Sequence, residues 1–176
     1  MRIMIMTVVF LFGMIGFSVA EEVIDNSGGI LKVDWSDAKS GQIKRTRSAI
    51  QKAIKNVTMP VYLPKDYLNQ NDATVVADNN FYVITIKLSD AVLMISGDRT
   101  YQREIVSGGE ELKANMKRAE SKFLQSEGIM STDFHRHGVN YILSIECTHP
   151  NSDKRCTRET FLKKMYNNLV LIGGKR

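Results

Sequence analysis

Residues 73–96, ATVVADNNFYVITIKLSDAVLMIS, alternate between apolar segments and short polar turns. Three apolar segments are rich in the β-branched and aromatic residues that favour strands: residues 73–77, 81–87 and 91–96. The turns between them, Asp78-Asn79-Asn80 and Ser89-Asp90, consist of residues that are common in turns. Both faces of the middle segment are apolar, as is typical of a central strand. The stretch therefore predicts an antiparallel meander at the centre of the fold.

Further strands are predicted on both sides of this meander. Residues 100–106 follow a Gly-Asp pair that tolerates the positive φ angles of tight hairpins, and they predict a fourth strand. Gly128 and Gly138 bracket residues 129–137, and residues 139–147 form a strongly β-prone run, so the two predict a second hairpin. The proline-containing residues 59–64 predict a connector or an edge strand. Residues 108–122 fit either a short helix or an exposed excursion.

Two helices are expected to pack on the sheet. Apolar side chains recur at helical spacing over residues 43–57 and predict an N-terminal helix. A C-terminal helix is predicted after Cys156, capped by Thr157 and ended by Gly173-Gly174. Its apolar side consists of Phe161, Leu162, Met165, Leu169 and Ile172. We therefore expect a single α+β domain over residues 41–176, with an antiparallel sheet of about five to six strands and a helix from each end of the domain packed on it.

The first 20 residues have the order of a secretory signal peptide. Arg2 precedes an apolar run over residues 3–17, and Ser18-Val19-Ala20 forms a small-x-small cleavage site. The run is shorter than the stretch of about 20 residues that spans a bilayer, so no stable membrane anchor is expected after cleavage. Residues 21–40 are expected to be a loose arm with one short extended piece, docked by Trp35. The predicted location is the bacterial periplasm or the cell exterior.

The two cysteines, Cys147 and Cys156, are predicted to form a disulfide. They are a close, even pair in a chain with an export signal, and the loop between them is polar. Closing a loop of about ten residues stabilises the folded state by about 2.7 kcal/mol in the chain-entropy model. A reactive thiol pair is the alternative, but the spacing is not C-x-x-C and no cationic helix start lies beside it. The bridge is therefore interpreted as a structural staple.

Basic residues decorate the predicted N-terminal helix. The chain has 24 Lys and Arg against 19 Asp and Glu, a net charge of +5, which is too mild to indicate nucleic-acid binding. On the helix, Arg45, Arg47 and Lys52 are candidates for contacting an acidic partner. A solvated helix face explains the same residues, because no aromatic side chains interleave the cations.

Residues Asp133, His135 and His137 are the one local cluster with metal-ligand chemistry. On a strand these alternate side chains share one face. Residues two apart on a strand do not converge on one zinc ion unless another element supplies a further ligand, for which Glu146 or His149 is a candidate. A polar strand face beside a turn is the competing interpretation. No cofactor is otherwise expected.

Other catalytic motifs are missing from the sequence. It contains no G-x-S-x-G elbow, no S-x-x-K and no phosphate-binding loop with its lysine. Paired carboxylates such as Glu110-Glu111 lie on polar segments, where nothing would raise the pKa of an acid. The sequence assigns no enzymatic reaction, and a non-enzymatic role is favoured.

The C-terminal part resembles a pattern in short exported proteobacterial proteins of unassigned function. The residues that carry the resemblance are 134–141, Ile145-Glu146-Cys147, Asp153-Lys154-Arg155-Cys156 and 169–174, with Met94-Ile95-Ser96-Gly97 in addition. An aromatic residue often stands in that pattern where this chain has His137. The resemblance implies export, a disulfide and no known catalytic residues.

The leading functional hypothesis is an exported, non-catalytic binding protein whose partner is another protein of the envelope. It could act as an inhibitor, an immunity-type protein or an envelope accessory factor. A metal-binding protein or metal-dependent enzyme that uses Asp133, His135 and His137 is the first alternative. A small-molecule carrier, with a ligand held between sheet and helices, is the second.

Overall fold

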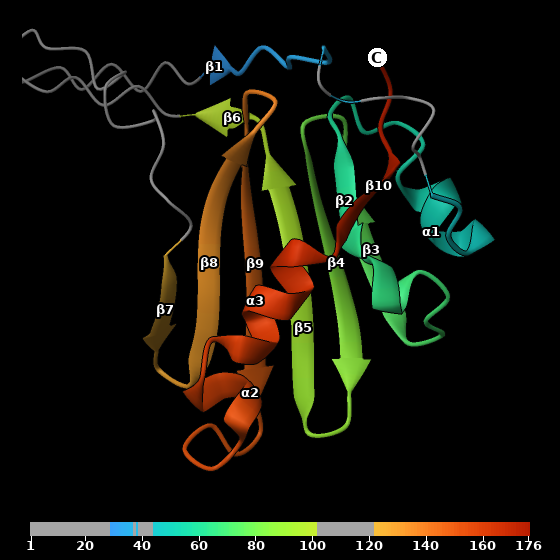
Figure 1. Cartoon of the computed structure of the whole chain (residues 1–176). Helices are drawn as coiled ribbons and strands as arrows, with labels where there is room; N and C mark the ends of the chain where they lie inside the picture. Colours follow the sequence, from blue (N-terminus) through green and yellow to red (C-terminus); the bar gives the residue numbers. More distant parts are fainter. Residues whose placement is uncertain (1–28, 37, 39–43, 102–121) are drawn as a thin grey trace, which may run out of the picture.

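Six antiparallel strands form the main sheet of the computed structural model, in the order β3-β4-β5-β9-β8-β7 (Figure 1). Their bounds are β3 Ala73–Ala77, β4 Phe81–Leu88, β5 Ala91–Asp98, β7 Phe123–Ser126, β8 Ile129–Arg136 and β9 Val139–Cys147. The structure describes residues 29–36, 38, 44–101 and 122–176. The predicted meander and second hairpin are confirmed. The predicted signal peptide, most of the fourth strand and nearly all of segment 108–122 lie outside the described residues.

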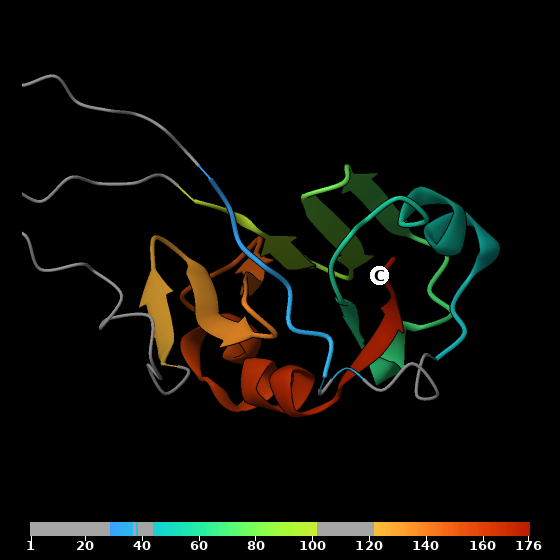
Figure 2. The same ribbon diagram turned by 90° about the horizontal axis from the view of Figure 1, so that it is seen from above.

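Smaller elements surround the sheet. Two short pairs are β1 (Gly29–Ile30) with β6 (Thr100–Tyr101) and β2 (Val61–Pro64) with β10 (Leu169–Gly173). The helices are α1 (Ser48–Ala53), the 3-10 turn η2 (Lys65–Tyr67), α2 (Lys154–Thr157) and α3 (Thr160–Asn167). Seen from above, α3 and β10 lie on the same face of the sheet (Figure 2). Within the described ranges, no helix has the length and apolar character needed to cross a membrane.

One face of the sheet forms the core. Its alternate side chains on β4, β5 and β9 are buried, and Leu162 and Met165 of α3 pack on them with exposed fractions of 0% and 2%. Two buried tyrosines hold β2 against this face: the Tyr141 hydroxyl donates to the Pro60 carbonyl, and the Tyr82 hydroxyl accepts from the Tyr62 amide. Burial raises the pKa of both phenols. The single α+β domain expected from the sequence is therefore present.

The opposite face of the sheet carries no other described element (Figure 2). On it, Met94 is 36% exposed and Ile142 is 44% exposed. Strand β4 lies inside the sheet as predicted, but its second apolar face is only partly covered, because Val83 and Thr85 are half-buried. Apolar residues on both faces of β4 therefore do not mean burial on both faces.

The β8–β9 hairpin closes through His137 and Gly138, with φ angles of +53° and +76°. Two consecutive positive φ values are typical of a type I′ turn, which suits a two-residue hairpin loop. The N-terminal arm lies directly over this turn: the Asp34 amide donates to the His137 carbonyl, and a Cβ at Gly138 would lie 2.3 Å from the Lys32 carbonyl oxygen. Position 138 therefore requires glycine, because the φ angle is positive and no space is left for a Cβ atom.

The predicted turn at Gly97-Asp98 is wrong, because β5 continues through both residues. A Cβ at Gly97 would lie 2.6 Å from the Tyr82 ring and 2.9 Å from the Tyr141 ring. The glycine makes room for two buried aromatic rings inside a strand, which is another common reason for a strand glycine.

The C-terminal helix is shorter than predicted. Thr157 is the last residue of α2 and does not cap α3, which begins at Thr160 and ends at Asn167. Leu169 and Ile172, assigned to the helix from their spacing, lie in β10 instead. Antiparallel pairing with β2, distant in sequence, overrides the helical periodicity of these residues.

The N-terminal helix is also shorter than predicted, because α1 comprises only Ser48–Ala53. Before it, the Thr46 hydroxyl donates to the Leu68 carbonyl. After it, Val57 is fully buried outside the helix, and its carbonyl accepts from the Lys175 amide. The contacts at both ends are made to distant parts of the chain, so local periodicity overestimates the helix.

Besides the Asp34 contact to the β8–β9 turn, further contacts hold the described part of the N-terminal arm. Leu31 donates its amide to the Arg99 carbonyl, and the Arg176 guanidinium lies 5.7 Å from the Trp35 ring centroid. Trp35 therefore docks the arm as expected. The extended piece predicted around it is regular only over Gly29–Ile30.

Candidate functional site

The predicted disulfide joins Cys147, the last residue of β9, to Cys156 in α2, with an S–S distance of 2.05 Å and a Cα–Cα distance of 6.2 Å. Cys147 is 6% exposed and Cys156 is fully buried. Two buried, bonded sulfurs offer no thiolate for chemistry. The disulfide is therefore a structural staple between the sheet and the helices.

Two polar residues fix the loop around this disulfide. The Asp153 carboxylate caps α2 by accepting from the Arg155 amide, and it also pairs with the Arg155 guanidinium. Hydrogen bonds from Arg155 hold the pKa of Asp153 below its ordinary value. Arg155 also donates to the Ser89 carbonyl in the β4–β5 turn at 2.9 Å. The Asp-x-Arg-Cys segment thus connects α2 to two strands of the sheet.

The three candidate basic residues do not form one helix face. Arg45 precedes α1, Arg47 is its N-cap and Lys52 lies in its last turn. All three are exposed. Arg47 donates to the carbonyls of Gln70 and Asn71 at 3.4 and 3.2 Å. Its charge therefore holds a loop, while Arg45 and Lys52 face solvent.

The structure separates the candidate metal ligands. Asp133 and His135 are exposed on the outer face of β8, where His135 Nδ1 lies 2.9 Å from Asn140 Oδ1. His137 lies in the turn, and its Nε2 is 2.6 Å from the Tyr62 hydroxyl. Over the described ranges, no three His, Cys, Asp or Glu side chains are grouped to hold a metal ion. The prediction that His137 lies on the strand is wrong, because His137 and Gly138 form the turn between β8 and β9.

An aromatic cluster under α3 surrounds Arg136. The guanidinium lies 5.5 Å from the Tyr62 ring centroid and 5.2 Å from those of Phe134 and Tyr166. Such placements are attractive because the cation faces the negative ring surface. Burial raises the pKa of Tyr62, and the Arg136 charge opposes that shift. The cluster places a cation beneath α3, close to the groove described next.

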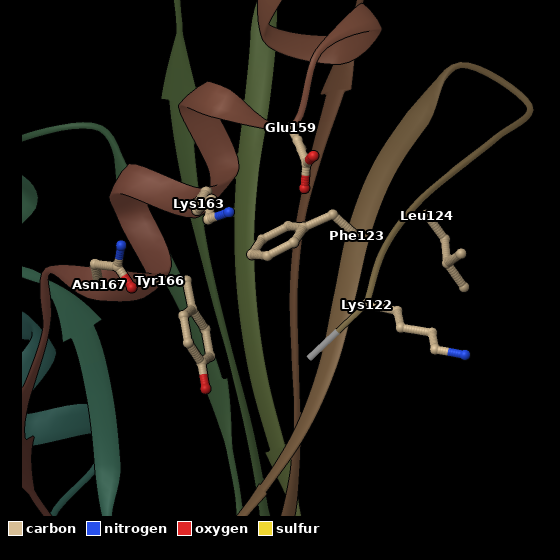
Figure 3. A pocket seen from close by; sticks show the side chains of 7 residues that line it. All are labelled: Lys122, Phe123, Leu124, Glu159, Lys163, Tyr166 and Asn167. Carbon is tan, nitrogen blue, oxygen red and sulfur yellow. The ribbon is translucent and has the colours of Figure 1, made fainter. Parts of the chain in front are cut away.

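A groove of about 480 Å³ lies between strand β7 and helix α3 (Figure 3). We call it the β7–α3 groove. Its lining residues are Lys122, Phe123, Leu124, Glu159, Lys163, Tyr166 and Asn167. The Phe123 and Tyr166 rings meet edge to face, with centroids 6.2 Å apart. Both rings are half-buried, so the groove has an apolar floor that water still reaches.

The walls of the β7–α3 groove carry charges of both signs. Lys122 and Lys163 are both exposed: Lys163 lies on the helix side beside Glu159 at the start of α3, whereas the Lys122 side chain projects from the strand away from α3 (Figure 3). Lys164, the next residue, lies 3.4 Å from Asp66. Within the described ranges, neither Lys122 nor Lys163 has such an ion pair. The groove therefore has an excess of cationic groups.

Sequence reasoning missed this groove. Phe123 and Tyr166 are far apart in the sequence, and each reads alone as an ordinary packing residue. The one available signal was the pair of lysines at positions 163 and 164 on the predicted helix. Only the fold shows that Lys163 lines the groove, whereas Lys164 pairs with Asp66. A comparison with protein-family models, with curated proteins and with solved structures finds no match for this chain.

Proposed function

We propose that the chain is an exported, non-catalytic binding protein and that its partner is another protein of the cell envelope. The observation that carries this proposal is the β7–α3 groove, where an aromatic floor, two exposed lysines and an edge strand lie together. Water-accessible aromatic rings flanked by polar groups are typical of protein recognition surfaces.

The disulfide and the sequence of the first 20 residues support the exported part of the proposal. Disulfides persist mainly in oxidising compartments, and Cys147 and Cys156 are bonded. The order of charged, apolar and small residues before Glu21 is that of a cleaved leader. The resemblance of the C-terminal part to short exported proteins agrees with both.

The alternatives receive less support. The metal interpretation requires Asp133, His135 and His137 to converge, and His137 lies in the turn with its Nε2 beside Tyr62. The carrier interpretation requires space between sheet and helices, where Leu162 and Met165 fill the interface. The β7–α3 groove lies at the edge of the sheet and is open.

Site-specific photo-crosslinking in the native compartment tests the proposal. A photoreactive residue at Leu124, 60% exposed beside the groove, is compared with one at Val76, 58% exposed on the opposite edge strand. We expect a discrete protein adduct from position 124 only, which Tyr166→Leu and Lys163→Glu both weaken. Equal adducts from both positions, or none from position 124, would contradict the proposal.

The basic residues before and within α1 provide a second surface for the same test. If the partner is acidic and docks there, Arg45→Glu with Lys52→Glu should slow association and weaken its salt dependence. Arg47 is left unchanged because it holds the loop at Gln70 and Asn71. Unchanged association in this double variant would leave recognition to the groove.

A further inference from the structure

We propose that the β7–α3 groove receives an extended segment of the partner, which adds as a strand to β7 and carries an apolar and an acidic side chain on the same face. This inference rests on the proposed function and names the class of ligand. Its three supports are the edge of β7, which pairs with β8 alone among the described strands, the aromatic floor, and the cationic groups of Lys163 and Arg136 beside that floor.

Strand β7 offers a backbone edge. Within the described ranges it pairs only with β8, and it is the terminal strand of the six-stranded sheet. Glu127 and Gly128 form the two-residue turn between β7 and β8, with φ angles of +50° and +84°. In such a hairpin the flanking pair, Ser126 and Ile129, is hydrogen-bonded, and pairs alternate from there.

This alternation defines which groups point outward. Leu124 and Ser126 direct their backbone groups toward β8, so the amide and carbonyl of Phe123 and Gln125 point away from it. An incoming strand can bond to these groups, as in the recognition mode in which a peptide extends a sheet. A residue placed opposite Phe123 then projects its side chain on the same face of the sheet as Phe123.

The face that receives this side chain is the aromatic floor. The Phe123 ring points toward Tyr166 (Figure 3), whose own ring meets Phe134 with centroids 5.0 Å apart. A large apolar side chain of the ligand would cover the water-exposed parts of Phe123 and Tyr166. Apolar burial of this kind stabilises a complex in proportion to the area removed from water.

The charges select an acidic neighbour for that apolar side chain. Lys163 stands on the helix wall of the groove, and the Arg136 guanidinium lies 5.2 Å from the Tyr166 ring centroid, whereas the Lys122 side chain points away from α3 (Figure 3). Glu159 is the one carboxylate in the lining. Residues two apart on a strand share a face, so an acidic side chain two positions from the apolar one would lie on the cationic side of the groove.

Peptide titration of the full mature chain, isotope-labelled and with its disulfide intact, tests the inference. The probe is a short capped peptide of β-branched residues with one Phe and, two positions later, one Glu. Its matched control has Lys in place of Glu. We expect saturable shifts of the amide signals of residues 122–126 and 159–167, with the control binding about tenfold more weakly at low salt.

Two variants of adjacent lysines sharpen the test. Lys163→Glu should remove or reverse the preference for the acidic peptide, whereas Lys164→Glu should keep it, because Lys164 pairs with Asp66 outside the groove. Both residues are exposed on α3, so neither substitution threatens the fold. A third peptide, with the Phe amide N-methylated, should bind weakly, because in antiparallel pairing opposite Phe123 this amide donates to the sheet.

Several results would overturn the inference. Equal binding of the acidic and basic peptides, or signal changes centred elsewhere, would contradict the ligand class. Protection of the Phe123 and Gln125 amides in the free monomer would identify this chain as the occupant, and a dimer abolished by Lys163→Glu would identify a second copy. If a crosslinked partner is found at position 124 but no peptide binds, the proposed function stands and only the ligand class is wrong.

Discussion

The disulfide loop lies at α2 and the β7–α3 groove lies along α3, and the two regions are built in opposite ways. At the disulfide loop, Cys156 is fully buried, and Asp153 and Arg155 satisfy each other and the Ser89 carbonyl. At the groove, Phe123 and Tyr166 are half-buried and Lys163 is exposed. The disulfide loop is held by bonds within the chain, whereas the groove presents partly exposed rings and an exposed lysine.

This difference indicates how a small domain divides its surface. A region whose polar groups are all bonded within the chain contributes stability but offers little to a partner. A region with partly exposed rings and unpaired charges contributes less stability and retains free energy for binding. Substitutions in the two regions should therefore separate stability from recognition.

The largest expected effect is that of Leu162→Ala. Leu162 is fully buried, whereas its neighbour Lys163 lines the groove. Removing a buried leucine side chain should lower the free energy of unfolding by about 2–5 kcal/mol, measured by urea denaturation. The folded fraction should still bind the acidic peptide. A loss below about 1 kcal/mol would show that α3 is loosely packed on the sheet.

The double substitution Cys147→Ala with Cys156→Ala should have the next largest effect. Removing the bridge restores the freedom of the unfolded chain and should lower the free energy of unfolding by about 2.7 kcal/mol. Peptide affinity, measured below the unfolding transition, should be unchanged. An affinity loss as large as that of Lys163→Glu would show that the two regions are coupled.

Asp153→Asn should have a smaller, pH-dependent effect. Hydrogen bonds from Arg155 hold the pKa of the Asp153 carboxyl below its ordinary value, so the folded state favours the ionised form. The stability this contributes is present above the unfolded pKa and is lost as the pH falls through the lowered value. We expect a loss of about 1 kcal/mol near neutral pH in urea denaturation.

The control for Asp153→Asn is the same comparison in acid. Below the lowered pKa both proteins carry a neutral side chain at this position, so their free energies of unfolding should converge. A difference that is the same at both pH values would show that the cap acts by geometry alone.

The smallest effect on stability is expected for Lys163→Ser. An exposed lysine without an ion pair within the described ranges should change the free energy of unfolding by less than about 0.5 kcal/mol. The same substitution should weaken the acidic peptide and leave the basic peptide unchanged in the titration. A stability change above about 1 kcal/mol would place Lys163 in the fold and not in recognition.

The central strands and the staple could be predicted from the sequence because their signals are local. The polar turn at residues 78–80 and the alternation in β4 define the meander, and Gly138 defines the second hairpin. The cysteine spacing and the leader sequence predict the disulfide. The turns, the strand alternation and the cysteine spacing each depend on residues close in the sequence, and the leader adds the compartment in which a disulfide persists.

The sequence-based predictions are wrong where contacts with distant segments determine the local structure. Leu169 and Ile172 fit a helix by spacing, yet pairing with β2 makes them a strand. The Gly97-Asp98 pair is typical of a turn, yet Gly97 lies within a strand, where a larger residue would clash with the Tyr82 and Tyr141 rings. The groove depends on α3 lying beside β7, which no local pattern encodes. The sequence indicates basic residues before and within α1 and the Asp133 cluster as candidates, whereas the structure brings aromatic rings and other lysines together at the groove.

The measurement that tests the central claim most directly is amide hydrogen exchange of the mature protein with and without the acidic peptide. The claim is that recognition lies in the β7–α3 groove and stability in the disulfide region. It predicts that the peptide slows exchange at Phe123 and Gln125 and leaves residues 154–157 unchanged. Slowed exchange at residues 154–157 or on the outer face around Ile142, with Phe123 and Gln125 unchanged, would contradict it.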